Sequence, residues 1–547
     1  MSDYKYLHIG RAGDLLNEKD RKLYRFLEIL PGLSAWLTLI LIVALSFLTP
    51  FFMALFIIAF DIYWLLKTVY LSFHLRVAYN RLKINSKINW LERLNSLPTS
   101  HFQLPISNWL DIYHIIFLPL YKESYEIVSA SIEGLLKTNY LKTKMMIVLC
   151  WEERGGDETR QVAEAVGRKY KNEFLEFMSV MHPVRGKTPS LAGSSADHAV
   201  QAGRTSNGTS PAVVSDEIPG KGSNTAYAAE RVRENLVDRL NLPHDKILVS
   251  NFDIDTVVSP EYFGILTYTF LTTPDPLKAS YQPIPLYVNN IWEAPSFARV
   301  VAFSATFWHT IKQERPESAT TFSSHSMSWQ ALEDVGFWQK NMVSEDSRIF
   351  WQCFLRYNGD YRVISLYYPV SMDANVAPTT FGTLKNVYKQ QRRWAYGVEN
   401  VPYFLFGFIK NKLIPLKKKL YYGFIAMEGN HSWSTNAIIL FLLGWLPVVV
   451  GGPEFNKTVL SFNLPYFTRT IMTLAMLGLI SSAVLSIILL PPRPPQFGRF
   501  KHLLMIFQWL LFPITTILLG AIPALDAQTR LMFGRYMGFW VTPKTRK

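Results

Sequence analysis

The stretch ILVSNFDIDTVVSPEYF, residues 247–263, is an apolar run that leads into two aspartates, Asp253 and Asp255. A short β-branched run that stops at Asp-x-Asp is typical of a buried strand that delivers two carboxylates to the carboxyl edge of a sheet. In an open α/β sheet, ligands bind at that edge. Two carboxylates this close repel each other unless a cation lies beside them, and a divalent cation that carries a phosphate is one solution. A plain turn is the alternative, because aspartate also favours strand ends.

The composition favours a membrane protein with a large soluble domain. Of 547 residues, 49% are apolar and only 18% are charged, which is apolar for a soluble protein but too charged for one buried entirely in lipid. The net charge is +14, and the basic residues cluster beside the apolar segments, which argues against nucleic-acid binding. Cys150 and Cys353 have no ligand-like spacing and indicate neither a disulfide framework nor a zinc site.

Five apolar segments approach or reach the length needed to cross a hydrocarbon core of roughly 30 Å. Two form a hairpin, 31–74, and three follow the soluble region; the segments cover residues 33–48, 51–73, 434–451, 466–490 and 502–524. A cleaved signal peptide is the alternative for the first, but its apolar run begins late and a second follows at once. Basic residues flank the hairpin on one side, which the positive-inside rule makes cytoplasmic. We therefore expect a multi-pass protein of the cell membrane with a cytoplasmic N-terminal arm, 1–30.

Three features of the membrane region carry their own expectations. Asp61 lies in the middle of the second segment, where a carboxylate is costly, so it should face another helix or a cavity. Residues 401–431 begin with an aromatic, apolar stretch bounded by lysines, which predicts helices at the membrane surface. The tail, 526–547, is basic, which indicates a cytoplasmic position. The C-terminal helices cover residues 432–525, and one full crossing of the membrane by the last of them would instead place the tail outside. A bent or re-entrant last segment is favoured by Pro513, Gly520 and Pro523.

Residues 75–400 have the composition of a soluble α/β domain. Short apolar runs predict strands, and the stretches between them predict helices, an alternation typical of a parallel sheet. The strands are expected at 115–121, 145–150, 174–183 and 247–252, and the helices at 125–139 and 159–171. Residues 185–213 are rich in Ser, Gly, Ala and Thr and lack aromatic residues, which predicts a flexible insertion.

Four further stretches belong with the Asp-x-Asp pair. They are Pro119-Leu-Tyr121-Lys-Glu123, Lys221-Gly-Ser-Asn224, Ser344-Glu345-Asp346 and Gln390-Gln391-Arg392-Arg393-Trp394. Each alone has a plain structural explanation. The acids suit a helix N-terminus, the arginines a membrane surface, the tryptophan an interfacial anchor and the lysine a solvated loop.

Taken together and in this order, the stretches carry the motifs P-x-Y-x-E, a strand ending in acids, K-x-x-N, D-x-D, S-E-D and Q-x-x-R-W, followed by membrane helices. On these motifs the chain resembles the membrane-embedded family 2 glycosyltransferases, which include cellulose, hyaluronan and chitin synthases. The motifs cover about residues 75–400, and the flanking helices match in arrangement only. The resemblance implies an α/β fold, with a cytoplasmic GT-A-like (Rossmann-like) domain inserted between transmembrane α-helices.

The resemblance also implies how this chain would hold its donor. Asp253 and Asp255 would bind Mg²⁺ or Mn²⁺ against the diphosphate of a nucleotide sugar, where the cation neutralises the leaving group. Arg393, helped by Arg392, would lie near the same diphosphate, because a guanidinium matches phosphate oxygens, and Gln390 would lie beside it. The remaining nucleotide contacts would come from Tyr121, Glu123, one of Glu152 and Glu153, and Lys221.

The same resemblance assigns the acceptor side. Asp346 would be the general base that takes the proton from an acceptor hydroxyl, in a single displacement that inverts the anomeric centre. Trp394 would offer its face to the acceptor sugar, and Glu345 would also contact the acceptor. Three departures from the family pattern affect these roles: glutamates at 152 and 153 where aspartates are common, Ser344 for threonine, and SSHSMSW at 323–329 without a Cys-Gly pair. His325 in that stretch is expected to be a polar pocket or core residue.

Three hypotheses follow. The first is an inverting, metal-dependent enzyme that transfers a hexose from a nucleotide sugar, expected to be a UDP-sugar, to a growing polysaccharide at the cytoplasmic membrane face, with extrusion through the helices. The second is transfer of one sugar to a lipid acceptor. The third is a transporter or scaffold whose functional groups would be Asp61 and Glu428. The expected partners are the donor, a glycan or lipid acceptor and membrane lipids, without nucleic acid; the sequence carries no signal for an oligomeric state.

Overall fold

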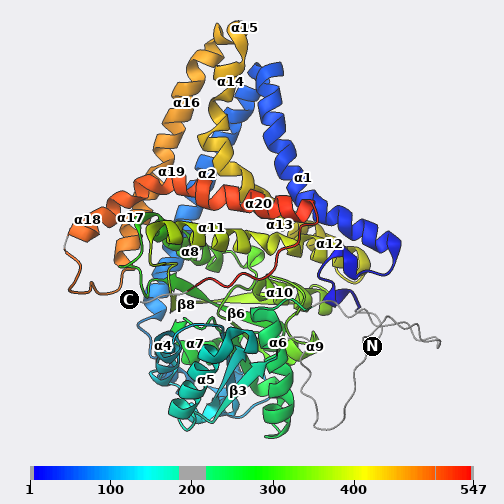
Figure 1. The fold of residues 1–547 in the computed structure, drawn as a ribbon, viewed down its shortest axis with the longest axis vertical. Helices are drawn as coiled ribbons and strands as arrows, with labels where there is room; N and C mark the ends of the chain where they lie inside the picture. The colour runs from blue at the N-terminus through cyan, green and yellow to red at the C-terminus, as the bar shows by residue number, and fades with distance from the viewer. Residues whose placement is uncertain (1–4, 184–216, 499, 544–547) are drawn as a thin grey trace.

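The computed structural model describes residues 5–183, 217–498 and 500–543, so the insertion predicted at 185–213 lies outside the described residues. Figure 1 shows an α/β domain at the bottom, long helices that rise from it at the top, and a layer of transverse helices between them. The predicted fold class, an α/β domain inserted between long apolar helices, is therefore confirmed. The placement of the domain on the cytoplasmic side stays a prediction.

One eight-stranded sheet forms the centre of the lower domain, with the order β3-β2-β1-β4-β7-β6-β8-β5. The four predicted strands are parallel neighbours: β1 Tyr113–Leu120, β2 Met145–Glu152, β3 Glu176–His182 and β4 Ile247–Asn251. In this register Ile116 of β1 lies between Ile147 of β2 and Ser250 of β4. Their carboxyl ends share one edge, as the alternation of strands and helices predicts.

The other half of the sheet is mixed, and the sequence did not predict it. Strand β7, His325–Ser328, runs antiparallel to both β4 and β6, Ala279–Tyr287, while β6 is parallel to β8, Arg362–Met372. The short β5, Val257–Val258, pairs with β8. Pro283 and Pro285 interrupt the pattern of β6, and the register shifts between Gln282 and Ile284, because a proline cannot donate to the ladder.

Helices cover both faces of the sheet. Helices α4 Tyr125–Leu136, α5 Gly156–Tyr170 and α7 Tyr262–Thr272 contribute to one buried cluster, joined by Trp90 and Leu94 of α3, Trp90–Asn95. The opposite cluster is built from α6 Lys221–Val232, α9 Trp329–Asp334 and α10 Glu345–Arg356, and it also includes side chains from both ends of the chain. A third cluster surrounds α8, Ser296–Gln313, which packs on β6.

Several long helices have the length and apolar character of membrane spans. Judged on those two properties alone, four described helices qualify, or five with a pair bent by 49°. The candidate spans include α1 Glu18–Leu48, α2 Pro50–Asn85, α16 Val459–Ala475 with α17 Leu477–Ile488, and the bent pair α13 Leu416–Phe441 and α14 Leu446–Val450. The short helix α15, Gly452–Asn456, joins α14 to α16 at the top of Figure 1. Asp61 of α2 is buried, as expected, and accepts a hydrogen bond from Thr468 Oγ1 at 2.8 Å.

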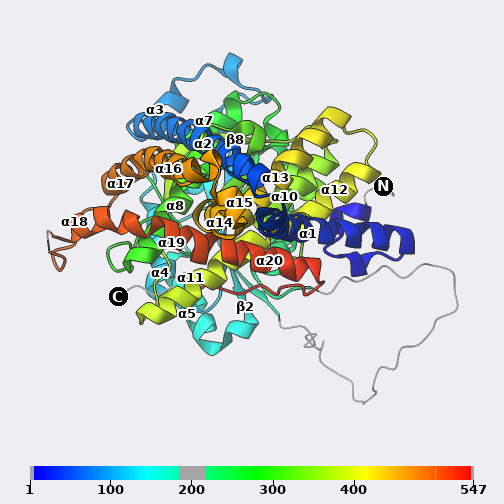
Figure 2. The same cartoon turned by 90° about the horizontal axis from the view of Figure 1, so that it is seen from above.

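The last apolar segment is one continuous helical stretch, Phe500–Met532, and is among the four helices with spanning character. Its α-helical parts, α18 Phe500–Phe507, α19 Phe512–Thr516 and α20 Ile522–Met532, are joined by a 3-10 turn, Gln508–Leu511, and a π-helical turn, Ile517–Ala521. Pro513 and Pro523 begin the second and third pieces, where a proline is tolerated because it needs no N–H partner. Figures 1 and 2 show this row running across the axes of α1, α2 and α16 rather than along them. The predicted bent or re-entrant path of this segment, and its position relative to a bilayer, stay predictions.

Helix α12, Asn400–Lys410, follows α11, Thr380–Ala395, and is the helix predicted at the membrane surface. Most of its apolar side chains are buried in the core that α1 and α10 share, and Ile409 and Lys410 are the exposed ones. The apolar stretch that suggested lipid contact is thus covered by protein. Contact of residues 401–431 with lipid stays a prediction.

A buried histidine in β1 predicts how the domain responds to acid. His114 packs against Tyr140 and Phe263 and shares a hydrogen bond of 2.9 Å with Thr267 Oγ1, and burial lowers its pKa to about 3. Below the unfolded pKa of about 6.5 the unfolded chain binds a proton that the folded chain does not, so stability falls as the pH falls from about 6.5 toward 3. Between pH 7 and pH 5 the loss from this residue is about 2 kcal/mol.

Denaturant unfolding of the purified protein at pH 7 and pH 5 measures this loss. His114→Gln should reduce the difference in unfolding free energy between the two pH values, whereas His101→Gln, at an exposed position, should leave it unchanged. An equal loss of stability in the wild type and in His114→Gln would contradict the assignment.

Candidate active site

The Asp-x-Asp pair lies at the carboxyl end of β4, as predicted, and its two members differ in environment. Asp255 is buried and accepts a hydrogen bond at Oδ2 from the backbone N–H of Asp373, at 3.1 Å. Asn289 Nδ2 donates to the backbone oxygen of Asp255 at 3.1 Å. Because Asn289 follows β6 and Asp373 follows β8, the unpredicted half of the sheet holds Asp255 in place. The Asp253 side chain is more exposed, at 28%.

Lys221 links the Asp-x-Asp pair to the acidic motif on α10. Its ammonium lies 2.7 Å from Asp253 Oδ1 and 2.9 Å from both carboxylate oxygens of Asp346. Lys221 is buried at the N-terminus of α6, and although burial alone would lower its pKa, Asp253 and Asp346 raise it. The lysine is therefore a fixed positive charge between two of the predicted functional carboxylates.

Glu345 and Asp346 begin α10 but occupy different environments. Glu345 is buried, and burial together with the Asp346 charge raises its pKa, which favours the protonated carboxyl, while the Lys221 charge opposes that rise. The Asp346 side chain is 22% exposed, and His325 Nδ1 lies 3.9 Å from its Oδ1. His325 is fully buried on β7, which lowers its pKa, and its Nδ1 shares a hydrogen bond with the Phe322 oxygen at 2.8 Å. It is a buried polar residue beside Asp346, in agreement with the expected pocket or core role.

A carboxylate that the sequence analysis missed fixes the loop before Asp346. Glu399 Oε1 accepts three hydrogen bonds, from Val343 N at 3.0 Å, Ser344 N at 2.8 Å and Ser344 Oγ at 2.8 Å. Burial raises the pKa of Glu399, while Arg348 and these donors oppose that rise. Its neighbour Asn400 donates to the hydroxyls of Ser344 and Ser347 at 3.2 and 2.9 Å. Glu399 lies five residues after Trp394, so it joins the Q-x-x-R-W helix to the acidic motif.

The expected nucleotide residues gather at the ends of β1 and β2. Glu123 Oε2 accepts the Tyr121 N–H at 2.6 Å, which closes a tight turn in which Lys122 has a φ of +64°. Glu152 is buried and paired with Arg154, whose Nη2 lies 2.9 Å from Oε1, and the Arg154 guanidinium covers the Tyr121 ring at 4.1 Å. Of the two glutamates after β2, Glu152 lines the cavity described below and Glu153 does not.

Helix α11 presents the Q-x-x-R-W residues to two different neighbours. Arg393 faces the site, and its guanidinium lies 4.9 Å from the centre of the Phe539 ring. Arg392 instead forms an ion pair of 2.9 Å with Asp526 of α20, so it braces the helices and does not line the site. Trp394 packs beside the Tyr287 ring, with centroids 5.8 Å apart, while Gln390 accepts a hydrogen bond from Asn375 at 3.4 Å.

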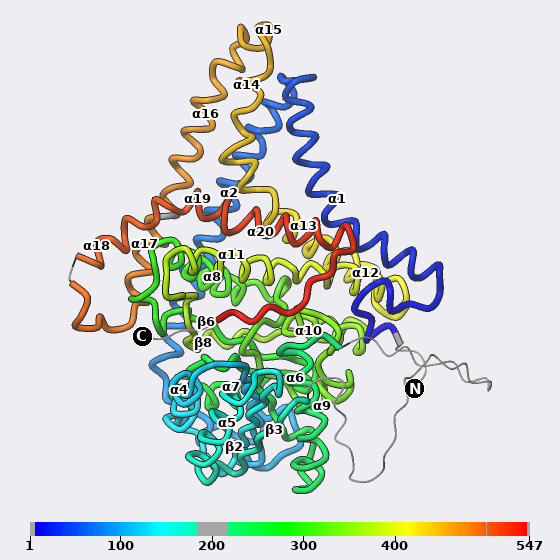
Figure 3. Tube along the Cα trace, in the orientation of Figure 1, coloured from blue at the N-terminus to red at the C-terminus, as the bar shows by residue number. Residues whose placement is uncertain are grey.

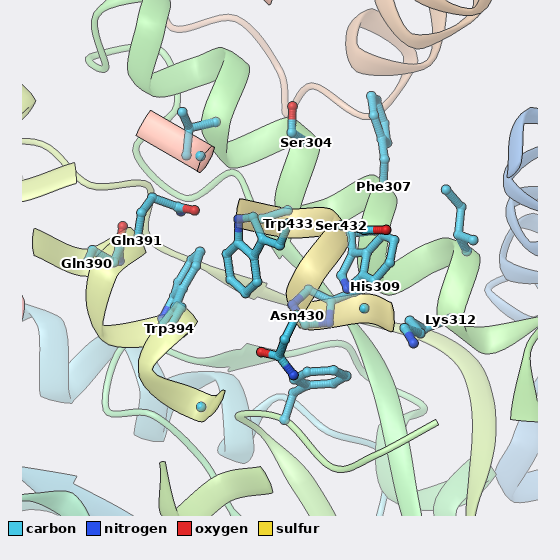
Figure 4. A pocket seen from close by; sticks show the side chains of 18 of the residues that line it. Ser304, Phe307, His309, Lys312, Gln390, Gln391, Trp394, Asn430, Ser432 and Trp433 are labelled. Atoms are coloured by element: carbon cyan, nitrogen blue, oxygen red, sulfur yellow. The ribbon is translucent and has the colours of Figure 1, made fainter. Parts of the chain in front are cut away.

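Most of the predicted site residues line one cavity of about 1560 Å³. The predicted residues that line it are Tyr121, Glu123, Glu152, Lys221, Asp253, Asp255, Glu345, Asp346, Gln390, Arg393 and Trp394. The cavity continues toward the long helices, where Figure 4 shows Trp433 of α13 and His309 and Lys312 of α8 around the same space as Trp394. Buried polar atoms on its wall have no hydrogen-bond partner among the described residues; they include Asn224 Oδ1, Asn375 Oδ1 and Arg393 Nε. Such atoms are satisfied by a ligand or by water.

The C-terminal tail also reaches the cavity, which the sequence did not predict. Figure 3 shows it returning from the end of α20 across the middle of the molecule. Phe539, Val541 and Thr542 line the cavity, and Phe539 packs so closely on Gly220 that an added Cβ there would lie 2.5 Å from its Cγ. No periodicity marks residues 533–543, and the lone signal was the aromatic pair Phe539-Trp540 in an otherwise basic tail.

The two carboxylates at the end of β4 supply some, but not all, of the ligands that a hard divalent cation requires. Among the described residues, no group of three or more His, Cys, Asp or Glu side chains is placed to hold a metal ion. Asp253 and Asp255 offer oxygen ligands, and Mg²⁺ is commonly bound by one or two carboxylates together with the phosphates of a substrate. The residues present therefore fit a cation that arrives with a diphosphate.

Comparison with known proteins gives a consistent picture. The model of the family described as "Glycosyl transferase family group 2" matches residues 248–523. A poly-beta-1,6-N-acetyl-D-glucosamine synthase of Staphylococcus epidermidis is 30% identical over 144 residues, which cover 26% of this chain and 32% of that protein. A protein of the same name from Staphylococcus aureus is 37% identical over 87 residues, 16% of this chain and 19% of that protein. The matched part thus spans about a third or less of these relatives.

Solved structures that are similar to this chain share a lower sequence identity with it. The mannosyltransferase PcManGT from Pyrobaculum calidifontis, in complex with GDP-Man and Mn²⁺, is 13% identical with a TM-score of 0.37 and covers 79% of this chain and 99% of that one. Residues 1–349 of TarS from S. aureus, in complex with UDP-GlcNAc, are 12% identical with a TM-score of 0.34 and cover 68% of this chain and 90% of that one.

The contact between Gly220 and the tail predicts the effect of one methyl group. In Gly220→Ala the added Cβ would meet Cβ and Cγ of Phe539, which cannot move without the tail backbone, so residues 536–543 should detach. Trypsin should then release the peptide that follows Arg535 several-fold faster, as followed by mass spectrometry. Gly13→Ala, whose Cβ would meet nothing within 4 Å, should be cleaved at the wild-type rate. Equal release from both variants would exclude the contact as the tail's anchor.

Proposed function

The chain belongs to glycosyl transferase family group 2, and on that premise we propose that it transfers a hexose from a nucleotide sugar, a UDP-sugar, to a growing polysaccharide at the cytoplasmic face of the membrane. The observation that carries the proposal is the shared cavity, which a fixed lysine, three carboxylates, an arginine and a tryptophan line from four separate segments of the chain. Isolated turns or helix caps, the plain alternatives, do not require these residues to meet. The relatives named as polysaccharide synthases support the same acceptor class.

The donor end of the cavity has the charges that a nucleoside diphosphate requires. Lys221 is a buried cation and Arg393 a partly buried one, both line the cavity with Asp253, and the unpartnered Arg393 Nε is available to a phosphate oxygen. Asp253 and Asp255 would hold Mg²⁺ or Mn²⁺, which supplies positive charge as the diphosphate leaves. Tyr121, Glu123 and Glu152 would bind the nucleoside.

Asp346 is the proposed general base. It would accept the proton of an acceptor hydroxyl while that oxygen forms a bond to the anomeric carbon, and the bond from that carbon to the diphosphate oxygen breaks with its electron pair. Because attack and departure occur on opposite faces, the anomeric configuration inverts. Lys221 holds both carboxylate oxygens of Asp346, which orients the base before the acceptor binds.

The acceptor side is aromatic and carries a buried carboxyl group. Trp394 and Tyr287 lie beside each other on the cavity wall, and aromatic faces suit the C–H surfaces of sugars. Glu345, in its protonated form, can donate a hydrogen bond to an acceptor oxygen. The cavity then continues to Trp433 of α13, so a product chain has a route toward the long helices.

A second candidate, transfer of one sugar to a lipid acceptor, is favoured by one observation. The cavity wall includes side chains between residues 63 and 72 of α2 and between residues 424 and 441 of α13, two helices with spanning character. A lipid could therefore present its head group directly to the cavity. Mass spectrometry of the product separates the candidates, because only the first yields a series of chain lengths.

Replacing the proposed base tests the enzyme directly. The purified protein is incubated with UDP- and GDP-sugars and Mg²⁺ or Mn²⁺, and release of the nucleoside diphosphate is followed. Asp346→Asn should reduce turnover by about 10²–10⁴-fold, because the amide accepts no proton, while nucleotide affinity changes little. Asp157→Asn, at a side chain that is 82% exposed, is the matched control. Absence of release from any donor, with or without the cation, would overturn the proposed function.

The position of Asp346 should in turn depend on Glu399. Glu399→Gln keeps an oxygen near the three donors but removes its charge, which weakens all three hydrogen bonds. We expect kcat to fall about tenfold with the KM for the donor nearly unchanged, because the donor site does not include the loop that Glu399 holds. Glu158→Gln, at an exposed position, should match the wild type. A rise in donor KM with kcat intact would contradict this role.

A further inference from the structure

A second group of cations lines the cavity at its membrane end, away from the proposed donor site. Lys312 lies near the C-terminal end of α8, Arg315 follows that helix, and Lys67 belongs to α2. All three side chains line the cavity. Figure 4 shows Lys312 and His309 across the cavity from Gln390 and Trp394. The proposed function uses none of these three cations.

Two of the three cations are neutralised within the protein. Lys67 Nζ lies 2.6 Å from Glu428 Oε1, and Arg315 Nε lies 3.1 Å from Glu317 Oε1. Lys312 instead donates to the backbone oxygen and the hydroxyl of Ser318, both at 3.1 Å and both neutral. Among the described residues, no carboxylate lies within ion-pair distance of Lys312. An ammonium has three N–H donors, so one remains available on the cavity side.

The surroundings of Lys312 compensate its charge only in part. Burial lowers its pKa to about 8, Arg315 and Lys67 add to this shift, and Glu317 and Glu428, which are already paired with Arg315 and Lys67, oppose it. His309 adds no compensating group, because burial lowers its pKa to about 4 and keeps the ring neutral. Asn430 and Ser432 of α13 are also neutral. A buried cation in such a place is stabilised by any anion that enters the cavity.

The location of the cluster indicates where such an anion comes from. On α2, Lys67 is flanked by the exposed apolar side chains Leu66, at 64%, and Val69, at 60%, and Phe424 of α13 is 72% exposed. Leu66 and Phe424 also line the cavity, so its rim is apolar beside these two helices. Both helices have the length and apolar character of membrane spans. Basic pockets between such helices, at the depth of the head groups, bind anionic lipids.

We propose that Lys312, together with Lys67 and Arg315, binds the phosphate group of an anionic membrane lipid at the membrane end of the cavity. The lipid chains would lie along α2 and α13, and the phosphate would take the free N–H of Lys312. The site is independent of the donor chemistry at Asp253 and Asp346, so it can be tested by binding alone, and its failure would leave the proposed transfer reaction unaffected.

The test is lipid retention by the full-length protein. The protein is purified in a neutral detergent and titrated with phosphatidylglycerol or phosphatidylcholine, and bound lipid is counted by native mass spectrometry. We expect the wild type to retain phosphatidylglycerol in preference to phosphatidylcholine. Lys312→Gln, which can still donate to Ser318, should bind it about tenfold more weakly, whereas Lys312→Arg should retain it. Lys417→Gln, an exposed lysine at the start of α13, is the matched control.

Each outcome decides the proposal. Loss in Lys312→Gln with retention in Lys312→Arg and Lys417→Gln supports the site. Equal retention by the wild type and Lys312→Gln overturns it, as does equal binding of the two lipids. A third arm adds inorganic phosphate at the same concentration as the lipid. If free phosphate displaces the lipid completely and depends on Lys312 in the same way, the site serves soluble phosphate and the lipid assignment is wrong.

Discussion

The site depends on one ammonium group held between two carboxylates. Asp253 follows β4, Asp346 begins α10 and Lys221 begins α6, so three elements far apart in sequence meet at Lys221 Nζ, within 2.7–2.9 Å. Without that cation, the carboxylates of Asp253 and Asp346 would repel each other in a partly buried space. The desolvation of a buried lysine is offset only by well-placed opposite charges, so the position of α6 and the position of the acids stabilise each other. Asn224 Nδ2, which donates to the Cys150 oxygen at 2.8 Å, ties the same helix to the end of β2.

Both ends of the chain complete this arrangement. Arg348, on the helix that carries Asp346, donates to the backbone oxygen of Ile9 at 2.9 Å and to Asn400 Oδ1 at 2.6 Å. From the other end, Phe539 packs between Gly220 and Arg393. The two ends also meet each other, because Tyr536 Oη donates to Glu28 at 2.9 Å. The acidic motif therefore cannot shift without disturbing contacts that extend to residues 9 and 539.

Much of this could be predicted from the sequence, and the failures have physical causes. The parallel strands β1 to β4 are continuous apolar runs, and such runs mark strands buried on both faces. Strands β6 to β8 carry prolines, serines and a bulge, so their pattern does not identify them, although they hold Asp255 through Asn289 and Asp373. The order of the motifs located the cavity residues, but it could not show that Arg393 faces the site and Arg392 does not. Neighbouring residues on a helix point in different directions, and Asp526, the ion-pair partner of Arg392, is 134 residues away in sequence. Glu399 was equally hidden, since its role exists only through the loop it binds.

The distribution of charge along the cavity implies a direction for the proposed reaction. Cations lie at both ends, with Arg393 and Lys221 near the Asp-x-Asp pair and Lys312 at the membrane end, and the aromatic residues Trp394 and Trp433 lie between them. A neutral sugar gains little from either cationic end and most from the aromatic wall. With the donor end filled by a nucleoside diphosphate, the aromatic side is the part of the cavity left for an acceptor, which would approach Asp346 past Trp394. Each transfer in a series would therefore move the product past Trp394 toward α13, and the anion site at the far end would lie beside its path rather than across it.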